Sequence, residues 1–401
     1  MPAELPCGAE KSRSHDNGDV TVRRPRRSMT TISYMTDVVF AVGALRELRP
    51  LLDRHRIARP FIITDRGVVV AGLTQAVFDS VGGGPIFDQT PPNPTEEAVE
   101  SAVSAFKSTS ADGIVALGGG SVIDLAKAVA LLATHAGVLA DYVAIANGGE
   151  RITSAVAPVI AIPTTSGSGS EVGRAALIVT RDRRKLAIIS PHLLPRCTIC
   201  DPALTLSMPP SLTAGTGMDA IAHCIETFLS PRVNPPADAI ALDGLQRGFF
   251  NIAQAVQSPS DVHARSEMMM ASLEGGLCFQ KGLGAVHALS HVLGSLEAPV
   301  LHHGTLNGIL LPAVLRFNEG SCSEKYARIR SALRLSQGHD LADVMADLQH
   351  KIGLPARLGD LGVDQDILPR LAREAMHDLS HATNPRTPDE DDYFQLLRDS
   401  F

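Results

Sequence analysis

Two pairs of residues, each spaced four positions apart, place metal-binding side chains in apolar sequence. Asp219 and His223 lie in "GTGMDAIAHCIETF", and His287 and His291 lie in "GLGAVHALSHVLGS". On a helix, residues four apart face the same side, so both members of a pair can reach one point. A single Asp/His pair is more often a local hydrogen bond or a satisfied core histidine than a metal site, so the remaining histidines decide between these interpretations.

Two more histidines, His302 and His303, follow in a turn that contains glycine. Four of the 14 histidines of the chain therefore fall within seventeen residues of apolar sequence. Buried imidazoles in that number are costly without polar partners, and a divalent cation would satisfy them. Either His302 or His303 could complete the site with Asp219. Three nitrogens and one oxygen suit Fe(II) or Zn(II) and do not decide between the two ions.

Two loops rich in small residues predict a phosphate-bearing ligand. In "GIVALGGGSVIDLAKAVA" an apolar strand runs into Gly118, Gly119 and Gly120, and Ser121 with Asp124 resembles a capping pair that opens a helix. Glycine lets the backbone approach a phosphate closely, and the free N–H groups at a helix start favour negative charge. A second loop, "AIPTTSGSGSEV", also follows an apolar strand and contributes hydroxyl donors, which include Thr164, Thr165 and Ser168. Two such loops at strand ends suit a dinucleotide.

Asp65 ends the apolar run "FIITD" upstream of both loops. A carboxylate at this place would accept hydrogen bonds from an adenosine ribose and repel a 2′-phosphate, although a helix cap or a turn explains it as well. In the dinucleotide fingerprint GxGxxG the acidic residue follows the glycines by about 20 positions. The order in this chain is the reverse, which excludes the ordinary Rossmann arrangement.

The elements that must position these residues divide the chain in two. Short β-branched runs alternate with helical stretches such as 96–108 and 121–134, which is typical of a mainly parallel sheet with helices on its faces. After "CDPALTLSMPPSL" the strand signal disappears, and long Ala/Leu/Met-rich segments continue to the C-terminus. We therefore expect a flexible tail over 1–28, an α/β domain over 29–205 and an all-α domain over 206–401.

Composition limits the possible partners. The net charge of −7 comes from well-mixed charged residues, so the sequence predicts neither nucleic-acid binding nor attachment to a membrane surface. No apolar stretch reaches the roughly 20 residues of a membrane span, and the N-terminus lacks an apolar signal core. These features favour a cytoplasmic protein with a small-molecule partner. The six cysteines are scattered, and "CTIC" at 197–200 is interpreted as a short strand rather than a zinc or redox pair.

The stretches "GGGSVIDLAKAVA", "IPTTSGSGSEV", "GTGMDAIAHCIE", "GAVHALSHVLGS" and "HHGTLNGILLPAVLRFN" resemble signatures of the iron-containing, group III alcohol dehydrogenase family. The resemblance runs from about residue 30 to the end. It implies an N-terminal dinucleotide-binding domain, a helical C-terminal domain, an active site in the cleft between them, and a homodimer or larger homo-oligomer. The metal ligands that it implies are Asp219, His223, His287 and His303, the last because it directly precedes Gly304.

The same resemblance implies roles for the cofactor residues. Asp65 would hold the adenosine ribose and favour NAD over NADP, while Gly118, Gly119, Gly120 and Ser121 would bind the pyrophosphate. Thr164, Thr165 and Lys185 would line the inner part of the cofactor site. The reaction implied is hydride transfer between a small alcohol, or its aldehyde or ketone, and the nicotinamide, with the metal polarising the substrate oxygen. His291, close to the metal but not bound to it, would relay a proton or support its neighbours.

Two alternatives compete with this interpretation. One is a related reaction of the same superfamily, such as a hydroxyacid-oxoacid transhydrogenase or a metal-free maleylacetate reductase, and the full ligand set argues against the metal-free enzyme. The other is a non-catalytic nucleotide-binding protein with a structural metal. Structural ions usually take a closed, Cys-rich shell, whereas this ligand set contains no thiolate. The identity of the alcohol is not determined by the sequence.

Overall fold

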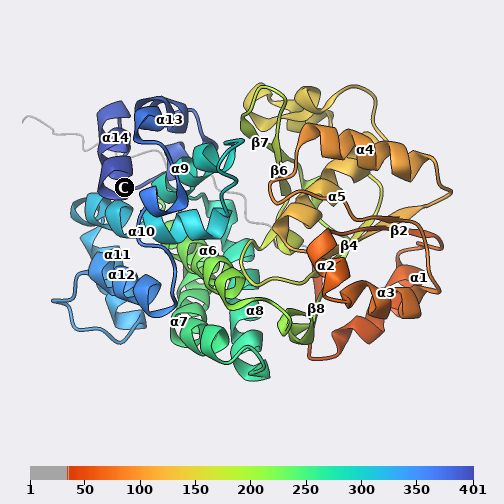
Figure 1. Ribbon diagram of the computed structural model, residues 1–401, viewed down its shortest axis with the longest axis horizontal. Helices are drawn as coiled ribbons and strands as arrows, with labels where there is room; N and C mark the ends of the chain where they lie inside the picture. The colour runs from red at the N-terminus through yellow and green to blue at the C-terminus, as the bar shows by residue number, and fades with distance from the viewer. Residues whose placement is uncertain (1–33, 35) are drawn as a thin grey trace, which may run out of the picture. The chain divides into compact units, whose positions relative to one another are not determined.

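The computed structural model describes Tyr34 and residues 36–401. The tail expected over 1–28 and the expected start of the α/β domain at residue 29 lie outside the described residues. Figure 1 shows the strands within the first half of the chain and helices α6 to α14 in the second half. The predicted fold class, a part with a parallel sheet followed by a helical part, is confirmed.

The main sheet has six strands in the order β1-β8-β5-β4-β2-β3. Every neighbouring pair in it is parallel. The strands are β1 (Asp37–Phe40), β2 (Pro60–Ile63), β3 (Ile86–Phe87), β4 (Gly113–Gly118), β5 (Val159–Pro163) and β8 (Cys197–Cys200). The "CTIC" run is thus a buried strand with free cysteines, as interpreted from the sequence. The parallel sheet with a non-standard Rossmann order is confirmed.

One of the short β-branched runs of the sequence forms a strand outside the main sheet. The run "RKLAIIS" contains β7 (Lys185–Ile189), but β7 pairs antiparallel with β6 (Ala175–Val179) in a separate two-stranded sheet. The five residues between β6 and β7 form a turn in which Thr180 and Arg184 exchange a hydrogen bond, with Thr180 N donating to Arg184 O. A connection this short joins strands as a hairpin, because a parallel neighbour needs a crossover of a dozen or more residues.

Helices cover both faces of the main sheet. Successive residues of β4 point to opposite faces: Ile114 and Ala116 belong to one hydrophobic cluster, Val115 and Leu117 to another. The first cluster includes α4 and α5, and the second includes α1 and α3. The helices of this half are α1 (Leu48–Arg54), α2 (Arg66–Val70), α3 (Leu73–Val81), α4 (Glu96–Lys107) and α5 (Gly120–Leu132). Burial on both faces explains why β4 reads as a continuous apolar run.

The helical half is built around α6. Its helices are α6 (Pro210–Leu229), α7 (Pro235–Gln257), α8 (Val262–Cys278), α9 (Ala285–Gly294), α10 (His303–Asn318), α11 (Ser323–Ala332), α12 (Leu341–Lys351), α13 (Leu368–Ala375) and α14 (Glu390–Asp399). Every residue of α6 from Thr213 to Leu229 is buried, and α7, α8 and α10 pack against it. A helix that is buried all round lies in the interior of its domain, so Asp219 and His223 are interior residues.

Within the described part of the chain, no helix combines the length and the apolar character that crossing a membrane requires.

Candidate functional site

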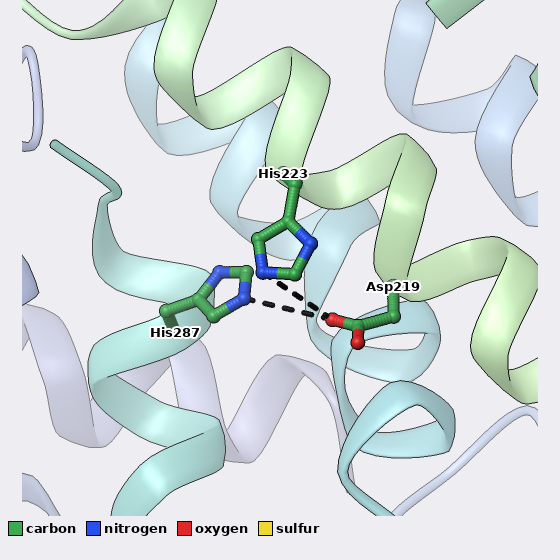
Figure 2. Close-up of side chains that lie close together, drawn as sticks. All are labelled: Asp219, His223 and His287. Atoms are coloured by element: carbon green, nitrogen blue, oxygen red, sulfur yellow. Dashed lines mark ion pairs between the residues drawn. The ribbon is translucent and has the colours of Figure 1, made fainter. Parts of the chain in front are cut away.

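Four metal-binding side chains from three helices converge in the helical half. Asp219 and His223 lie on α6, His287 on α9, and His303 is the first residue of α10. Oδ1 of Asp219 lies 3.8 Å from Nε2 of His223, 3.6 Å from Nε2 of His287 and 3.8 Å from Nε2 of His303. Figure 2 shows the side chains of Asp219, His223 and His287 pointing toward one another. One carboxylate oxygen is therefore the common neighbour of three imidazole nitrogens.

Close packing of α10 against α6 brings His303 to this point. A Cβ atom on Gly304 would lie 2.3 Å from the carbonyl oxygen of Gly215, so only glycine permits this approach of the two helices. Because His303 directly precedes Gly304, the same contact carries its ring next to Asp219. The need for a glycine directly after His303 thus has a steric explanation.

The start of α9 is fixed by two buried polar side chains. Glu226 accepts a hydrogen bond from the backbone N–H of Val286 at 2.7 Å, and its other oxygen lies 2.5 Å from Nδ1 of His287. Asn384 accepts a hydrogen bond from the N–H of Ala285 at 3.0 Å. Since Nδ1 of His287 is engaged by Glu226, its Nε2 faces Asp219. Such a carboxylate behind an imidazole fixes the orientation of a metal-ligating histidine.

The imidazole of His223, on α6, is also oriented by a hydrogen bond at its Nδ1. Nδ1 of His223 lies 3.3 Å from the carbonyl oxygen of Gly167, in the second glycine-containing loop. The N–H at Nδ1 donates to this carbonyl, which leaves Nε2 with a lone pair on the side of Asp219. The loop "TTSGSGS" therefore contacts the ligand cluster as well as the cleft beside it.

The electrostatics suit cation binding. Burial lowers the pKa of His223 to about 4 and holds the pKa of His303 well below its usual value, so both rings are neutral near pH 7. Burial would raise the pKa of Asp219, but the surrounding imidazoles hold it well below the ordinary range. For His287, burial alone would lower the pKa, but the neighbouring Glu226 and Asp219 carboxylates raise it to about 9. A cation bound at Nε2 would replace that proton, as metal binding to histidine commonly requires.

The ligand atoms of Asp219, His223 and His287 all lie within 4.8 Å of one another, which fits one shared divalent ion; His303 is outside this group, but its Nε2 lies 3.8 Å from Oδ1 of Asp219. Ligand bonds of about 2.0–2.2 Å place two ligands of a tetrahedral ion about 3.4 Å apart, and the three distances here are 3.6 to 3.8 Å. Two buried polar atoms beside the cluster, Nδ1 of His303 and Oδ1 of Asn307, have no hydrogen-bond partner among the described residues. Three imidazole nitrogens and one carboxylate oxygen are a donor set for Fe(II) or Zn(II).

The two other histidines near the cluster, His302 and His291, make different contacts. Nδ1 of His302 accepts a hydrogen bond from the N–H of Thr305 at 3.3 Å and so caps α10. Nδ1 of His291 lies 2.8 Å from a carboxylate oxygen of Asp378, and its ring stacks on that of His303 with centroids 5.3 Å apart. Of the alternatives that the sequence left open, this geometry favours His303 over His302 as the residue nearest to Asp219.

A cavity of about 1560 Å³ joins this cluster to the edge of the sheet. The sequence-predicted residues on its wall are Asp65, Gly119, Gly120, Ser121, Asp124, Thr164, Thr165, Ser168, Lys185, Asp219, His223, His287, His291, His302 and His303. Asp65, Gly119 and Thr164 follow the carboxyl ends of β2, β4 and β5, which are neighbours in the sheet. Ligands of open α/β sheets bind in the crevice outside these strand ends.

Gly118 is the exception among the predicted cofactor residues, because it is not part of the cavity wall. A Cβ atom at this position would lie 2.5 Å from a methyl carbon of Val122, so Gly118 allows α5 to pack closely on β4. The capping pair expected at Ser121 and Asp124 is also wrong. Gly119 occupies the N-cap position of α5 without a side-chain cap, and the Ser121 hydroxyl donates to the carbonyl of Pro92.

The start of α5 keeps its anion-binding character for a different reason than expected. Asp124 turns away from the helix start and accepts hydrogen bonds from the Ser170 hydroxyl at 2.5 Å and from the N–H of Leu177 at 3.1 Å. The N–H groups of Val122 and Ile123 donate to the carbonyl of Gly119, and because no side chain caps α5, the N–H groups of Gly120 and Ser121 are left to bind an anion. Asp65, for its part, does cap a helix: its Oδ1 accepts from the N–H of Val68 at 2.9 Å.

Four residues of this region were not predicted from the sequence: Lys127, Glu226, Asn307 and Asp378. For two of them helical spacing is a usable signal, because Glu226 follows His223 by three positions and Asn307 follows His303 by four. Asp378 meets His291 from a distant segment, and Lys127, although it follows Asp124 by three positions on α5, donates its hydrogen bonds to carbonyls more than 40 positions away. These last two contacts arise only from the tertiary fold.

Asn307 touches three of the four converging atoms. Its Nδ2 lies 2.7 Å from Oδ1 of Asp219, 3.2 Å from Nε2 of His287 and 3.3 Å from Nε2 of His303. The side chain is completely buried. Its amide therefore links the converging side chains of α6, α9 and α10.

Comparisons with known proteins agree with this architecture. The model of the iron-containing alcohol dehydrogenase family matches residues 35–202, and that of the Fe-containing alcohol dehydrogenase family, C-terminal, matches residues 213–401. The 4-hydroxybutyrate dehydrogenase of Cupriavidus necator is 49% identical over 381 residues, covering 93% of this chain and 100% of the relative. The NAD-dependent methanol dehydrogenase of Bacillus methanolicus is 31% identical over 376 residues, covering 90% and 97%.

A solved structure shows the same fold. The crystal structure of a 1,3-propanediol oxidoreductase superimposes with a TM-score of 0.87 at 32% identity, covering 93% of this chain and 100% of that one. The family models together span most of the chain, and the relatives match it over nearly their whole length. By sequence and by fold, the chain belongs to the iron-containing alcohol dehydrogenase family.

Proposed function

We propose that this protein transfers a hydride between a small alcohol and NAD, with a divalent ion held by Asp219, His223, His287 and His303. The observation that carries the proposal is the approach of three imidazole Nε2 atoms to within 3.6–3.8 Å of one buried carboxylate oxygen. This cluster shares one cavity with the two loops that are suited to a dinucleotide. When bound, the ion supplies a Lewis acid that polarises the substrate oxygen.

The side chains around the cluster are suited to handle the proton of the alcohol. Asp378 engages Nδ1 of His291 at 2.8 Å, which leaves Nε2 of His291 as the proton acceptor. Burial would raise the pKa of Asp378, but His291 and the Ser380 hydrogen bonds hold it low, so the carboxylate stays ionised and orients the ring. His291 lines the cavity and can accept a proton from a substrate hydroxyl there.

The loops hold the nucleotide across the sheet edge. Free amides at the start of α5 bind the pyrophosphate, and the hydroxyls of Thr164, Thr165 and Ser168 with Lys185 line the nicotinamide side. Lys185 Nζ donates to the side-chain oxygen of Asn93 at 3.2 Å, which fixes its position at the cavity wall. Asp65 keeps one carboxylate oxygen beyond its cap hydrogen bond, and its charge disfavours the 2′-phosphate of NADP. The name of the methanol-oxidising relative supports NAD as the cofactor.

Loading the purified protein with Fe(II) or Zn(II) and supplying small primary alcohols tests the proposal. With 1-butanol or 1,3-propanediol we expect NADH to form, and NADPH to form more slowly from NADP because of Asp65. The reverse reaction with the matching aldehyde should consume NADH. If neither ion supports NADH formation with any small alcohol, the dehydrogenase assignment fails and a non-catalytic nucleotide-binding role takes its place.

The competing reactions have distinct signatures. A transhydrogenase passes the hydride from a hydroxyacid to an oxoacid while the dinucleotide stays bound, so it turns over without net NADH. A maleylacetate-reductase-like enzyme needs no metal, whereas the complete set of four ligand side chains supports a metal-dependent reaction. A structural metal is disfavoured because structural shells are closed, while the four predicted ligands here line an open cavity.

The contacts of Asn307 predict that its amide sets the metal affinity. We expect Asn307→Leu to raise the dissociation constant for Zn(II) by about 10- to 100-fold, because it removes the hydrogen bond from Nδ2 that orients the Asp219 carboxylate, and loss of such a partner of a metal ligand typically weakens binding by this factor. Leucine is close to asparagine in size, so the buried volume stays filled. Competition against a chromophoric chelator measures the affinity. Thr305→Val is the matched control, because the Thr305 hydroxyl contacts His302 rather than a ligand. Wild-type affinity in the leucine variant would refute the role.

A further inference from the structure

The part of the cavity beyond the metal cluster has an unusual distribution of charge. The described residues that line it from Ser207 onward belong to the helical half, and they include many apolar side chains, among them Phe279, Leu283 and Leu379. Within this set, Asp219 is the only acidic residue and Arg232 is the only lysine or arginine. The wall that the helical half contributes thus presents one metal cluster and one guanidinium, while Lys185 of the α/β half reaches the cluster itself, where, besides burial, its charge helps to lower the pKa of His302 and His303.

Arg232 is free to bind a ligand. Its side chain is exposed, and none of the hydrogen bonds, ion pairs and ring contacts among the described residues involves it. By contrast, Lys281, which lies nearby through the hydrogen bond from the Ser230 hydroxyl to its carbonyl oxygen, is buried and paired with Asp238. The guanidinium of Arg232 therefore carries an uncompensated positive charge at the wall of an otherwise apolar region.

Helix α6 carries two residues of the metal cluster and leads directly into the segment that contains Arg232. Helix α6 carries Asp219 and His223 and ends at Leu229, and Arg232 follows three residues later. Six residues of helix separate His223 from Leu229, which is about 9 Å along the axis. The segment after the helix is anchored at Asn234, whose side chain caps α7 by accepting from the N–H of Ala237 at 3.2 Å. Arg232 thus lies in the short bend between α6 and α7, and these two helices hold its backbone close to the end of α6.

We propose that Arg232 binds the carboxylate of an ω-hydroxy acid whose hydroxyl end is oxidised at the metal cluster. This inference rests on the proposed function and specifies its substrate class. An arginine fork matches a carboxylate with two parallel hydrogen bonds, and the apolar wall between the two centres suits the methylene chain. In the reaction, R–CH₂OH and NAD⁺ give R–CHO, NADH and a proton, which passes to His291. The name of the Cupriavidus relative, a 4-hydroxybutyrate dehydrogenase, agrees with this class.

A matched substrate pair tests the proposal. 4-Hydroxybutyrate and 1-butanol share a four-carbon chain and a terminal hydroxyl, and they differ in having a carboxylate or a methyl group at the other end. We expect the wild-type protein to prefer 4-hydroxybutyrate. In Arg232→Met the ratio of kcat/KM for 4-hydroxybutyrate to that for 1-butanol should fall by roughly 10- to 150-fold, the equivalent of a hydrogen bond to a charged group. Arg232→Lys, which keeps the charge but loses the fork, should recover part of this ratio.

Arg174 provides the control. It is also exposed, lines the same cavity and has no side-chain partner among the described residues, but it belongs to the α/β half. Arg174→Met should leave the substrate ratio at the wild-type value. An unchanged ratio in Arg232→Met, with 1-butanol still oxidised, would overturn the Arg232 assignment and leave the dehydrogenase function intact. Absence of turnover with both substrates would instead count against the proposed function, and calorimetry with butyrate would then decide: binding equal in wild type and Arg232→Met refutes the carboxylate site.

Discussion

The His287→Ala variant is expected to lose both its bound metal and its turnover. His287 supplies one of the three Nε2 atoms near Asp219, and Glu226 orients it from behind. Removing it deletes a ligand and leaves the buried Glu226 carboxylate without its main partner. A Lewis acid lowers the activation barrier by several kcal/mol, and each 1.36 kcal/mol changes the rate by a factor of ten. We therefore expect turnover to fall by about 10³-fold or more. Elemental analysis and NADH formation measure the two effects.

His302→Ala is the matched control for this experiment. His302 is also a cavity-lining histidine, but its ring caps α10 through Thr305. We expect this variant to keep its metal content and to lose about 1 kcal/mol of unfolding free energy, the usual cost of a lost helix cap. Full metal content and turnover in His287→Ala would show that the ligand assignment is wrong. Loss of metal in His302→Ala but not in His303→Ala would instead make His302 the fourth ligand.

The Lys127→Met variant is expected to be destabilised by about 3–5 kcal/mol, the range seen when one partner of a buried charge network is removed. The Lys127 ammonium is fully buried and donates to the carbonyls of Ser170, Gly173 and Ala175 at 2.7–2.8 Å, and to the Ser170 hydroxyl. Burial lowers its pKa to about 8, so it remains protonated at pH 7. Without it, these carbonyls and the neighbouring Asp124 lose their donor in the interior.

The loss of Lys127 should also affect the cofactor site. Lys127 holds the segment after the loop that contains Thr164 and Ser168, so the KM for NAD should rise in the variant. Urea-induced unfolding gives the stability change. Lys107→Met is the control, since Lys107 is exposed and donates only to the Leu132 carbonyl, and surface substitutions of this kind stay within about 0.5 kcal/mol of wild type. A Lys127→Met protein as stable as the Lys107 variant would contradict the role of the buried ammonium.

The sequence by itself determined the features that follow from local periodicity and residue type. The apolar run "GIVALG" specifies a strand covered on both faces, and it forms the central strand β4. The spacing of four between Asp219 and His223 specifies one face of a helix, and these two side chains do meet in α6. Both inferences succeed because a strand's burial and a helix's repeat are properties of a few consecutive residues.

Only the tertiary structure decided features that depend on residues distant in the chain. Whether Asp124 caps its own helix or reaches Ser170 depends on where the second loop packs, and it reaches Ser170. Between His302 and His303, the approach of Gly304 to Gly215 decides which ring lies beside Asp219. Glu226 and Asp378 are partners of histidines 61 and 87 positions away. The sequence does not show which distant histidine each carboxylate will meet, because these contacts form where the packing of buried helices closes the space between them.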